Sequence, residues 1–347
     1  MVDIDTDSRA FLPALDVQDQ PLAHALQIDG RAPFSRIAEV LGVSDQTVAR
    51  RYTRLRTTST LRVVGLTDPL RVGDTWFVRV RCTPDAAGSV GEALARHPDT
   101  SWVKLTSGGT EIICNVRTHE PGHPGESDAL LLQKLPRTPR VVDVSAHSLL
   151  HVFFGRKRSA AGKSGPLTPE QVAALTPADA PACRPDEPAA PYPLDARDHR
   201  LLAVLAQDGR APLGELAAAT GWSQTTVRRR LAELRAAGVL YFDLDYHPRI
   251  LQHGFRATLW LQVEPARLDA VGRALAEHPE VPFAAATTGT TNLFASISTQ
   301  SAGSFYRYLT GPVASLPGVQ HASTAPTHRI LKGPGPRWPQ AGAAAKS

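Results

Sequence analysis

The sequence predicts an α+β protein with two helix-turn-helix domains of the winged or three-helix type, each followed by a ferredoxin-like βαββαβ domain. Two observations lead to this prediction. An internal repeat covers most of the 347 residues and opens with Asp-Gly-Arg-Ala-Pro, present at 29–33 and again at 208–212 (an offset of 208 − 29 = 179). In each repeat, a short helical part with a glycine turn precedes alternating strand-like and helix-like segments. We therefore expect two copies of one two-domain unit, here called the first and second units.

The composition is that of an ordinary globular protein, with 42% hydrophobic and 20% charged residues. No apolar run is long enough for a transmembrane helix, so no membrane partner is expected. The acidic N-terminus argues against a signal peptide. Three cysteines without metal-ligand spacing predict neither a disulfide framework nor a metal site, which favours a reducing cytoplasm. A net charge of +5 and a pI near 9.3 permit nucleic-acid binding.

The helix-turn-helix domains are predicted at 15–66 and 194–245. Each has a small residue where two helices touch, a glycine in the turn and a valine inside the second helix. Gly42 and Gly221 can end the first helix in a left-handed conformation, and Ser44 and Ser223 are ready N-caps for the second. A spacing of i, i+4, i+7 then predicts one buried face of the second helix. Its residues are Val48, Tyr52 and Leu55 in the first unit, and Val227, Leu231 and Leu234 in the second.

The opposite face of the second helix is rich in Arg, Gln and Thr. Arg reads guanine bidentately, Gln reads adenine, and the remaining side chains can hold phosphates. The alternative is a solvated basic helix that packs on a partner, but the pattern occurs in both units, which favours double-stranded DNA as the partner. The candidate DNA-binding residues are Ser44, Gln46, Thr47, Arg50, Arg51 and Arg54 in the first unit, and Ser223, Gln224, Thr225, Thr226, Arg228, Arg229 and Arg230 in the second.

The βαββαβ domains are predicted at 73–155 and 254–332. Period-two alternation and glycine turns place the strands, and His-Pro pairs at 97–98 and 278–279 end the first helix of each domain. Arg79 and Arg81 point off the core, either into solvent or toward a partner sheet opposite Trp260 and Gln262. In the first unit, Val90 and Leu94, together with Ala93, indicate a helix face before His97. The other expected elements are 77–82, 102–105, 111–116, 128–135 and 141–152 in the first unit, and 258–263, 267–277, 283–287, 293–298, 305–315 and 320–330 in the second.

A proline- and alanine-rich linker is predicted at 156–193, between the two units. Within it, Thr168 as N-cap and Pro169 at the first helical position favour a short helix that runs to Leu175. The tail after Lys332 is rich in Gly, Pro and Ala, and we expect it to be disordered.

The sequence resembles that of the Lrp/AsnC family of bacterial transcription regulators. The resemblance rests on Leu-x-x-Asp-Gly-Arg at 205–210, on Gly-Trp-Ser-Gln-Thr-Thr-Val-Arg-Arg-Arg-Leu-Ala-Glu-Leu at 221–234, and on the glycine turn between the middle strands of the following domain. Family members have one such unit per chain, and their βαββαβ domains pair sheet to sheet into dimers that often assemble further. The resemblance therefore implies a pseudo-dimer within one chain, further homo-oligomers, and a small effector, typically an amino acid.

The resemblance places the effector near the glycine turn. The family turn usually reads Gly-x-x-Asp, whereas here Glu111 and Asn292 stand at the last position. Glycine N–H groups can hold a carboxylate, and Glu111 can meet an ammonium group that the neutral Asn292 cannot. We expect the first unit to be the better amino-acid binder; a plain hairpin turn is the alternative. The candidate effector-binding residues are Thr106, Gly108, Gly109, Glu111, Thr288, Gly289, Thr291 and Asn292.

The main alternative function is enzymatic. Sirohaem decarboxylases are similar in fold to the Lrp/AsnC family, occur as paired subunits, and use histidine and arginine around a tetrapyrrole. A pure effector-binding module is a third class. Both DNA-reading faces are retained here, so we expect a regulator without catalytic residues, metal or cofactor. The spacing of the histidines does not favour a metal site either; they are His119, His123, His147 and His151.

Overall fold

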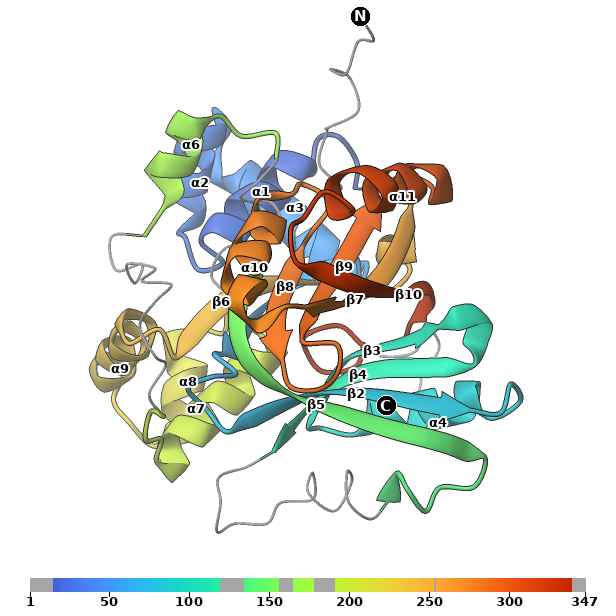
Figure 1. Cartoon of the computed structure of the whole chain (residues 1–347). Helices are drawn as coiled ribbons and strands as arrows, with labels where there is room; N and C mark the ends of the chain where they lie inside the picture. Colours follow the sequence, from blue (N-terminus) through green and yellow to red (C-terminus); the bar gives the residue numbers. More distant parts are fainter. Residues whose placement is uncertain (1–14, 119–133, 156–164, 178–190, 253, 339–347) are drawn as a thin grey trace, which may run out of the picture.

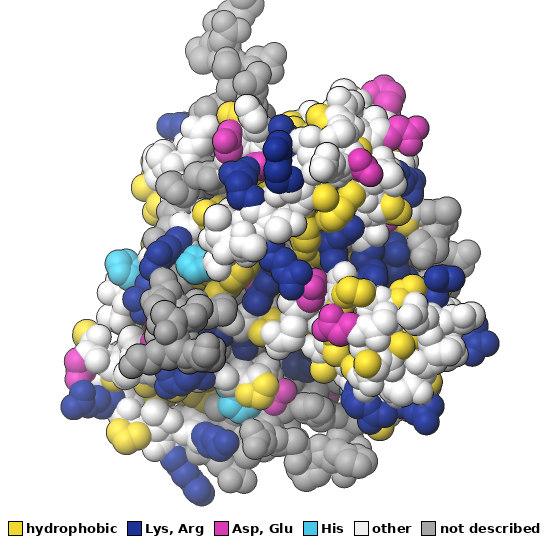
Figure 2. All heavy atoms as spheres, turned by 180° about the vertical axis from the view of Figure 1, so that it is seen from behind, with side chains coloured by type: hydrophobic (Ala, Val, Ile, Leu, Met, Phe, Trp, Pro, Cys, Tyr) yellow, Lys and Arg dark blue, Asp and Glu magenta, His cyan; other side chains and the backbone are white. Residues whose placement is uncertain are grey.

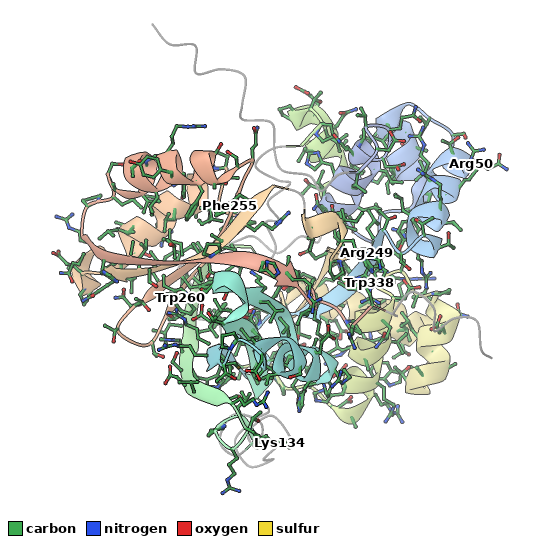
Figure 3. The ribbon with its side chains drawn as sticks, turned by 90° about the vertical axis from the view of Figure 1, so that its right-hand side faces the viewer. Arg50, Lys134, Arg249, Phe255, Trp260 and Trp338 are labelled. Carbon is green, nitrogen blue, oxygen red and sulfur yellow. The ribbon has the colours of Figure 1, made fainter. Side chains whose placement is uncertain are left out.

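The computed structural model describes residues 15–118, 134–155, 165–177, 191–252 and 254–338 (Figure 1). It confirms the predicted α+β fold class. Both helix-turn-helix domains lie on one side of the molecule and the two βαββαβ domains on the other (Figure 3). No helix in the described ranges is long and apolar enough to cross a membrane.

Each helix-turn-helix domain consists of three helices. The left-handed Gly42 (φ 66°) and Gly221 (φ 73°) end the middle helix of each domain, as predicted. The side chains of Ser44 and Ser223 accept hydrogen bonds from the backbone N–H groups of Thr47 and Thr226, so both predicted N-caps are confirmed. The predicted buried faces are confirmed as well. The helices are α1 (Gln20–Ile28), α2 (Phe34–Leu41) and α3 (Asp45–Thr57) in the first unit, and α7 (Ala196–Gln207), α8 (Leu213–Thr220) and α9 (Gln224–Ala236) in the second.

A strand follows each helix-turn-helix domain, and the two strands pair with each other. β1 (Leu61–Thr67) and β6 (Leu240–Tyr246) run antiparallel from Leu61 opposite Tyr246 to Thr67 opposite Leu240. Neither strand was expected from the sequence, although Leu61 and Leu244 each lie between two polar residues. The pairing joins the two domains around a pseudo-two-fold axis.

The repeated Asp-Gly-Arg-Ala-Pro segments meet at this axis. Arg31 donates to the carbonyl oxygens of Gly209 (2.7 Å) and Ala211 (3.1 Å). Arg210 donates in return to the carbonyl oxygens of Gly30 (2.7 Å) and Ala32 (2.9 Å). The strongest sequence repeat is therefore an isologous interface within one chain, in which each segment binds the other.

The two βαββαβ domains form one closed barrel of eight strands. Its order is β10-β3-β4-β2-β5-β8-β9-β7, and the seams between the units are β5–β8 and β10–β3. The expected pairing of the two domains within the chain is thus present in the structure. The strands are β2 (Asp74–Cys82), β3 (Thr100–Thr106), β4 (Glu111–Thr118) and β5 (Val141–Phe154) in the first unit, and β7 (Phe255–Val263), β8 (Phe283–Thr287), β9 (Leu293–Thr299) and β10 (Val319–Ile330) in the second.

Helices cover the outside of the barrel, while aromatic side chains fill part of its interior. Helices α4 (Ala87–Arg96) and α10 (Leu268–Glu277) end at His97 and His278, as predicted. Inside, Phe77 stacks 4.6 Å from Phe294 and meets Trp260 edge-on at 6.4 Å between ring centroids. The outer cover also includes α11 (Ala302–Tyr308) and its π-helical extension Leu309–Val313, which together overlap the helix expected at 305–315 but begin and end earlier.

The linker contains the predicted short helix, α6 (Pro169–Leu175), and its Thr168 forms a capping box with Gln171. The helix docks on the first helix-turn-helix domain, where Arg36 donates to the carbonyl oxygen of Ala174 at 2.6 Å and Gln171 donates to that of Val40. The helix expected at 128–135 lies almost entirely outside the described residues.

The prediction of a disordered tail is wrong for residues 333–338. Trp338 is buried, and the guanidinium of Arg62 lies 4.2 Å above its ring. Arg337 pairs with Glu92, and the backbone N–H of Trp102 donates to the carbonyl oxygen of Gly333 (3.0 Å). The Gly/Pro composition indicates only a lack of regular structure; the order comes from partners on distant parts of the chain.

Candidate DNA-binding and effector sites

The outer faces of α3 and α9 carry exposed polar side chains. Gln46 and Arg50 are exposed on α3, as are Gln224, Thr225 and Arg228 on α9. Within the described part of the chain, Arg50 and Arg228 form no ion pair. Arg229 makes only a long ion pair with Glu233, at 3.4 Å, with its side chain 75% exposed. Ser44, Ser223, Thr47 and Thr226 lie at the N-termini of these helices, where backbone N–H groups favour phosphate.

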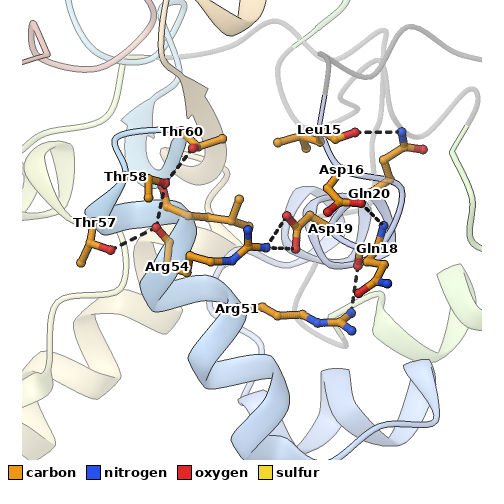
Figure 4. Close-up of polar contacts among 11 residues, drawn as sticks. Leu15, Asp16, Gln18, Asp19, Gln20, Arg51, Arg54, Thr57, Thr58 and Thr60 are labelled. Carbon is orange, nitrogen blue, oxygen red and sulfur yellow. Dashed lines mark hydrogen bonds and ion pairs between the residues drawn. The ribbon is translucent and has the colours of Figure 1, made fainter.

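Three of the candidate arginines are instead held by their own domain. Arg54 donates to both oxygens of the buried carboxylate of Asp19, at 2.6 and 2.7 Å, and Arg51 donates to the carbonyl oxygen of Gln18 (Figure 4). Arg230 binds the buried Asp198 at 2.7 and 2.8 Å. Its hydrogen bonds to Asp198 and Glu233 raise the pKa of Arg230. These arginines fasten the first helix of each domain to the helix that carries the polar face.

The aspartate of these arginine–aspartate pairs occupies equivalent positions in the two units, whereas the arginine does not. Asp19 and Asp198 are equivalent at the offset of 179, whereas Arg230 is equivalent to Arg51 and not to Arg54. Arg54 lies about one helical turn after Arg51, so it reaches the same carboxylate from the next turn. Asp19 and Asp198 were not among the predicted functional residues, although their constant offset of 179 was a signal in the sequence.

Positive charge dominates the side of the molecule that carries the two helix-turn-helix domains. In Figure 3 both helix-turn-helix domains lie on the right, with Arg50 at the surface. This right-hand side is the face that Figure 2 shows from the front. On that face dark blue Lys and Arg side chains outnumber magenta carboxylates. Such a surface attracts the phosphate backbone of DNA in a salt-dependent manner.

At the glycine turn of the first unit, the carboxylate of Glu111 is already bound. Arg79 contacts Oε1 at 2.8 and 2.9 Å, and the hydroxyls of Thr106 and Ser107 donate to Oε2 at 3.0 and 3.3 Å. Arg79 also lies 5.4 Å from the ring centroid of Trp260, so this arginine does face the partner sheet. Glu111 thus holds the turn and its supporting arginine together.

A hollow of about 570 Å³ opens beside this turn. Gly108 and Gly109 have positive φ angles of 69° and 86° and expose the backbone here. Arg81 is exposed and forms no ion pair with another described residue. Since Arg79 neutralises Glu111, Arg81 leaves the hollow with a net positive charge, which suits an anionic group. The lining residues are Arg79, Arg81, Cys82, Ser107, Thr110, Glu111 and Val142.

The turn of the second unit is built into the barrel seam. Asn292 pairs with the backbone of Val263, whose N–H and carbonyl oxygen both lie 2.9 Å from the amide. Thr288 accepts from the backbone N–H of Ser148 (2.8 Å), and its carbonyl oxygen accepts from Nδ1 of His147 (2.8 Å). Gly289 (φ 108°) lies directly against that imidazole, and the carbonyl of Thr291 accepts from Thr287. Thr288 and Gly289 are exposed nonetheless, so the two turns differ in their bonding partners and not in their accessibility.

The histidines considered for a metal are not brought together in the described part of the chain. His147 and His151 lie along β5, and no group of three or more His, Cys, Asp or Glu side chains among the described residues is placed to hold a metal ion. His119 and His123 lie outside the described residues.

Known proteins share these features. Residues 15–56 and 194–235 match the AsnC-type helix-turn-helix domain, and residues 256–335 match the Lrp/AsnC ligand binding domain. The HTH-type transcriptional regulator FL11 of Pyrococcus horikoshii is 30% identical over 133 residues, 38% of this chain and 87% of the relative. FL11 of Pyrococcus furiosus is 28% identical over 140 residues, 40% of this chain and 92% of the relative.

A solved structure resembles the whole chain. The crystal structure of the siroheme decarboxylase NirDL aligns with a TM-score of 0.60 and 14% identity, covering 90% of this chain and 92% of that one. At this identity the likeness concerns the fold alone. The relatives that align in sequence are transcriptional regulators, and each corresponds in length to about one of the two units. The chain belongs to the Lrp/AsnC family of transcription regulators and carries the helix-turn-helix domain of that family twice.

Proposed function

We propose that the chain is a sequence-specific regulator whose two helix-turn-helix domains bind the two half-sites of one operator in the cytoplasm. The observation that carries this proposal is the β1–β6 pairing, which fixes the two domains around a pseudo-two-fold axis with both polar faces exposed. In dimeric regulators such an axis matches the symmetry of a palindromic operator. Here the dimer is contained in one chain.

The two half-sites differ in sequence. Gln46 and Arg50 contact bases in one, and Gln224, Arg228 and Arg229 in the other. The positions that enter the major groove are not identical, since Asp45-Gln46-Thr47 in one unit corresponds to Gln224-Thr225-Thr226 in the other. The operator is therefore an imperfect palindrome. Ser44, Thr47, Ser223, Thr225 and Thr226 serve the phosphates at the helix N-termini, while Arg51, Arg54 and Arg230 orient the reading helices.

Fluorescence anisotropy with an operator selected from random DNA tests this assignment. Arg50→Ala and Arg229→Ala each remove one base contact, and each is expected to weaken binding by about 1–3 kcal/mol, roughly 5- to 150-fold. Arg197→Ala, which removes an exposed arginine of α7, is the matched control. Operator affinity of the double variant equal to that of the control would refute the reading role of these helices.

For the effector, we propose a small molecule with a carboxylate, such as an amino acid, bound in the hollow beside the first turn. Arg81 provides the recognition of the carboxylate, and Gly108 and Gly109 keep the backbone of the turn accessible beside it. The hydrogen bonds that already engage Thr288 and Asn292 favour the first turn over Thr288, Gly289, Thr291 and Asn292 as the effector site. Sedimentation with and without the ligand tests whether it also controls assembly of several chains.

A thermal-shift screen of amino acids and simple carboxylates tests the effector site. A ligand of the hollow should stabilise the wild type and fail to stabilise Arg81→Met or Gly108→Val, whereas Arg96→Met on the nearby α4 should respond normally. Glu111→Ala should also lose the response, because it frees Arg79 and the turn. The amino-acid assignment fails if no amino acid raises the melting temperature of the wild type.

The enzymatic alternative has the shared fold as its support. Its solved relative was also crystallised with an iron-uroporphyrin III analogue. Titration of this chain with an iron tetrapyrrole, followed by absorbance, distinguishes the two functions: a shifted Soret band with stoichiometric binding would favour the enzyme, and an unchanged spectrum would leave the regulator.

A further inference from the structure

The two ends of the barrel interior are filled differently. The domains are related by an offset of 181 (255 − 74, the first residues of β7 and β2). At one end Phe77, Phe294 and Ala285 form an apolar cluster with Trp260. At the other end the residues equivalent to Phe77 and Ala285 are Thr258 and Lys104. A lysine thus stands where the other unit has an alanine in a packed core.

Lys104 lies on the inner face of β3, because its neighbours Val103 and Leu105 belong to the outer core beneath α4. Its ammonium is 3.4 Å from the hydroxyl of Ser296 on β9 and 5.6 Å from the ring centroid of Trp102. No carboxylate among the described residues pairs with it. Burial, together with the nearby charge of Arg256, lowers the pKa of Lys104 to about 8, so the side chain is mostly protonated at neutral pH.

Two further polar groups face the same space. Arg256, at the start of β7, lies opposite Ser298 in the β7–β9 register. Ser296 and Ser298 share the inner face of β9, since Ala295 and Ile297 pack in the outer core. The hydroxyl of Ser298 is buried and has no hydrogen-bond partner within the described part of the chain. Burial lowers the pKa of Arg256 to about 10, while its Nε donates to the carbonyl oxygen of Leu251 (2.6 Å).

A half-buried ammonium without a counter-charge is unfavourable, because burial removes its hydration and a second cation adds repulsion. One anion would neutralise the ammonium and accept from both serine hydroxyls. We propose that this end of the barrel is a binding site for a small carboxylate, held by Lys104, Ser296 and Ser298 with Arg256 as the second positive charge. The site is separate from the hollow at Arg81, which lies at the glycine turn of the first unit.

The chemistry of the donors favours a carboxylate over a phosphate. The ammonium and the two hydroxyls suit the two oxygens of a carboxylate. A phosphate carries more charge and has more oxygens to satisfy in a space enclosed by strands. Lys104 remains partly exposed, so solvent reaches this part of the chain.

Thermal melting with acetate, propionate or inorganic phosphate, against chloride at the same ionic strength, tests the site. The wild type should melt at a higher temperature with acetate or propionate. Lys104→Met should melt higher than the wild type in chloride, because it removes a poorly solvated charge, and should gain nothing from carboxylate. Lys134→Met, which removes a lysine far from the barrel interior (Figure 3), is the matched control.

Ser298→Ala gives a second, milder test. Its hydroxyl has no hydrogen-bond partner among the described residues, so this variant should fold and melt in chloride like the wild type. It should bind carboxylate about tenfold more weakly, the effect of one hydrogen bond to a charged group. Arg81→Met should keep the response. The proposal is overturned if carboxylates leave the wild-type melting temperature unchanged, if Lys104→Met still responds to them, or if phosphate alone stabilises the protein.

Discussion

Replacing Arg210 with methionine is expected to weaken the interface between the two helix-turn-helix domains. The guanidinium of Arg210 donates to the carbonyl oxygens of Gly30 and Ala32, across the pseudo-two-fold axis. It also lies 4.3 Å from the ring centroid of Phe34. Methionine keeps much of the aliphatic packing but removes both hydrogen bonds and the charge. The two carbonyl groups then lose their partners at a half-buried site.

The magnitude follows from these contacts. A hydrogen bond from a charged donor contributes about 1.5–3 kcal/mol, and the contact with the ring of Phe34 about 0.5–1 kcal/mol. Water can reach part of this half-buried site, so the sum of the individual terms is an upper bound. We expect a loss of about 3 kcal/mol in the free energy of unfolding. With a urea dependence of about 3 kcal/mol/M, the unfolding midpoint falls by roughly 1 M.

Urea denaturation followed by circular dichroism measures this effect, with Arg197→Met as the matched control. Arg31→Met should behave alike, since it breaks the reciprocal bonds, and the double variant should lose less than the sum of the two because both act on one interface. Operator affinity should fall as well, because the spacing of α3 and α9 is then held by the β1–β6 pairing without the bonds of Arg210. This reasoning would be refuted if the urea midpoint of Arg210→Met lay within about 0.2 M of the midpoint of the control.

Three further predictions concern the same framework. Gly209→Ala should cost about 2–3 kcal/mol in a chemical unfolding titration, because its Cβ would lie 2.8 Å from Val63 Cγ1 and 2.9 Å from the backbone of Val64, whereas Gly88→Ala, in open space on α4, should be neutral or stabilising. Asn292→Asp should lower the melting temperature, at a cost of about 2 kcal/mol, because the carboxylate cannot donate to the carbonyl oxygen of Val263; Asn115→Asp on β4 is the control, and equal melting of the two variants would contradict the assigned role. Burial and the nearby Asp245 raise the pKa of Asp243 to about 7. A carboxyl whose folded pKa lies above its unfolded value of about 3.9 contributes stability at low pH and loses it as the pH rises to about 7. The urea midpoint of the wild type should therefore fall over this pH range, and Asp243→Asn should make that fall smaller. An unchanged pH profile of the variant would count against the raised pKa.

The sequence alone determined the local structure of this protein. Gly42 and Gly221 end helices because glycine adopts positive φ at little cost, and Ser44 and Ser223 begin the next helices because their hydroxyls accept from N–H groups three residues away. These interactions lie within a few residues of each other, so residue type and spacing predict them. The constant offset between the repeats extended the same prediction to both units and to the βαββαβ domains.

Tertiary structure decided which of the predicted polar residues remain available. Arg54, Arg230 and Glu111 have the residue types expected of a site, yet their charges are bound by Asp19, Asp198 and Arg79. The tail at 333–338 and the Arg31–Arg210 exchange likewise depend on partners that are far away in sequence. Charge pairing and close packing act between groups that only the folded chain brings within a few ångströms, and no local periodicity records those distances. The same reason explains why Lys104, an unremarkable residue of a strand, stands out only inside the closed barrel.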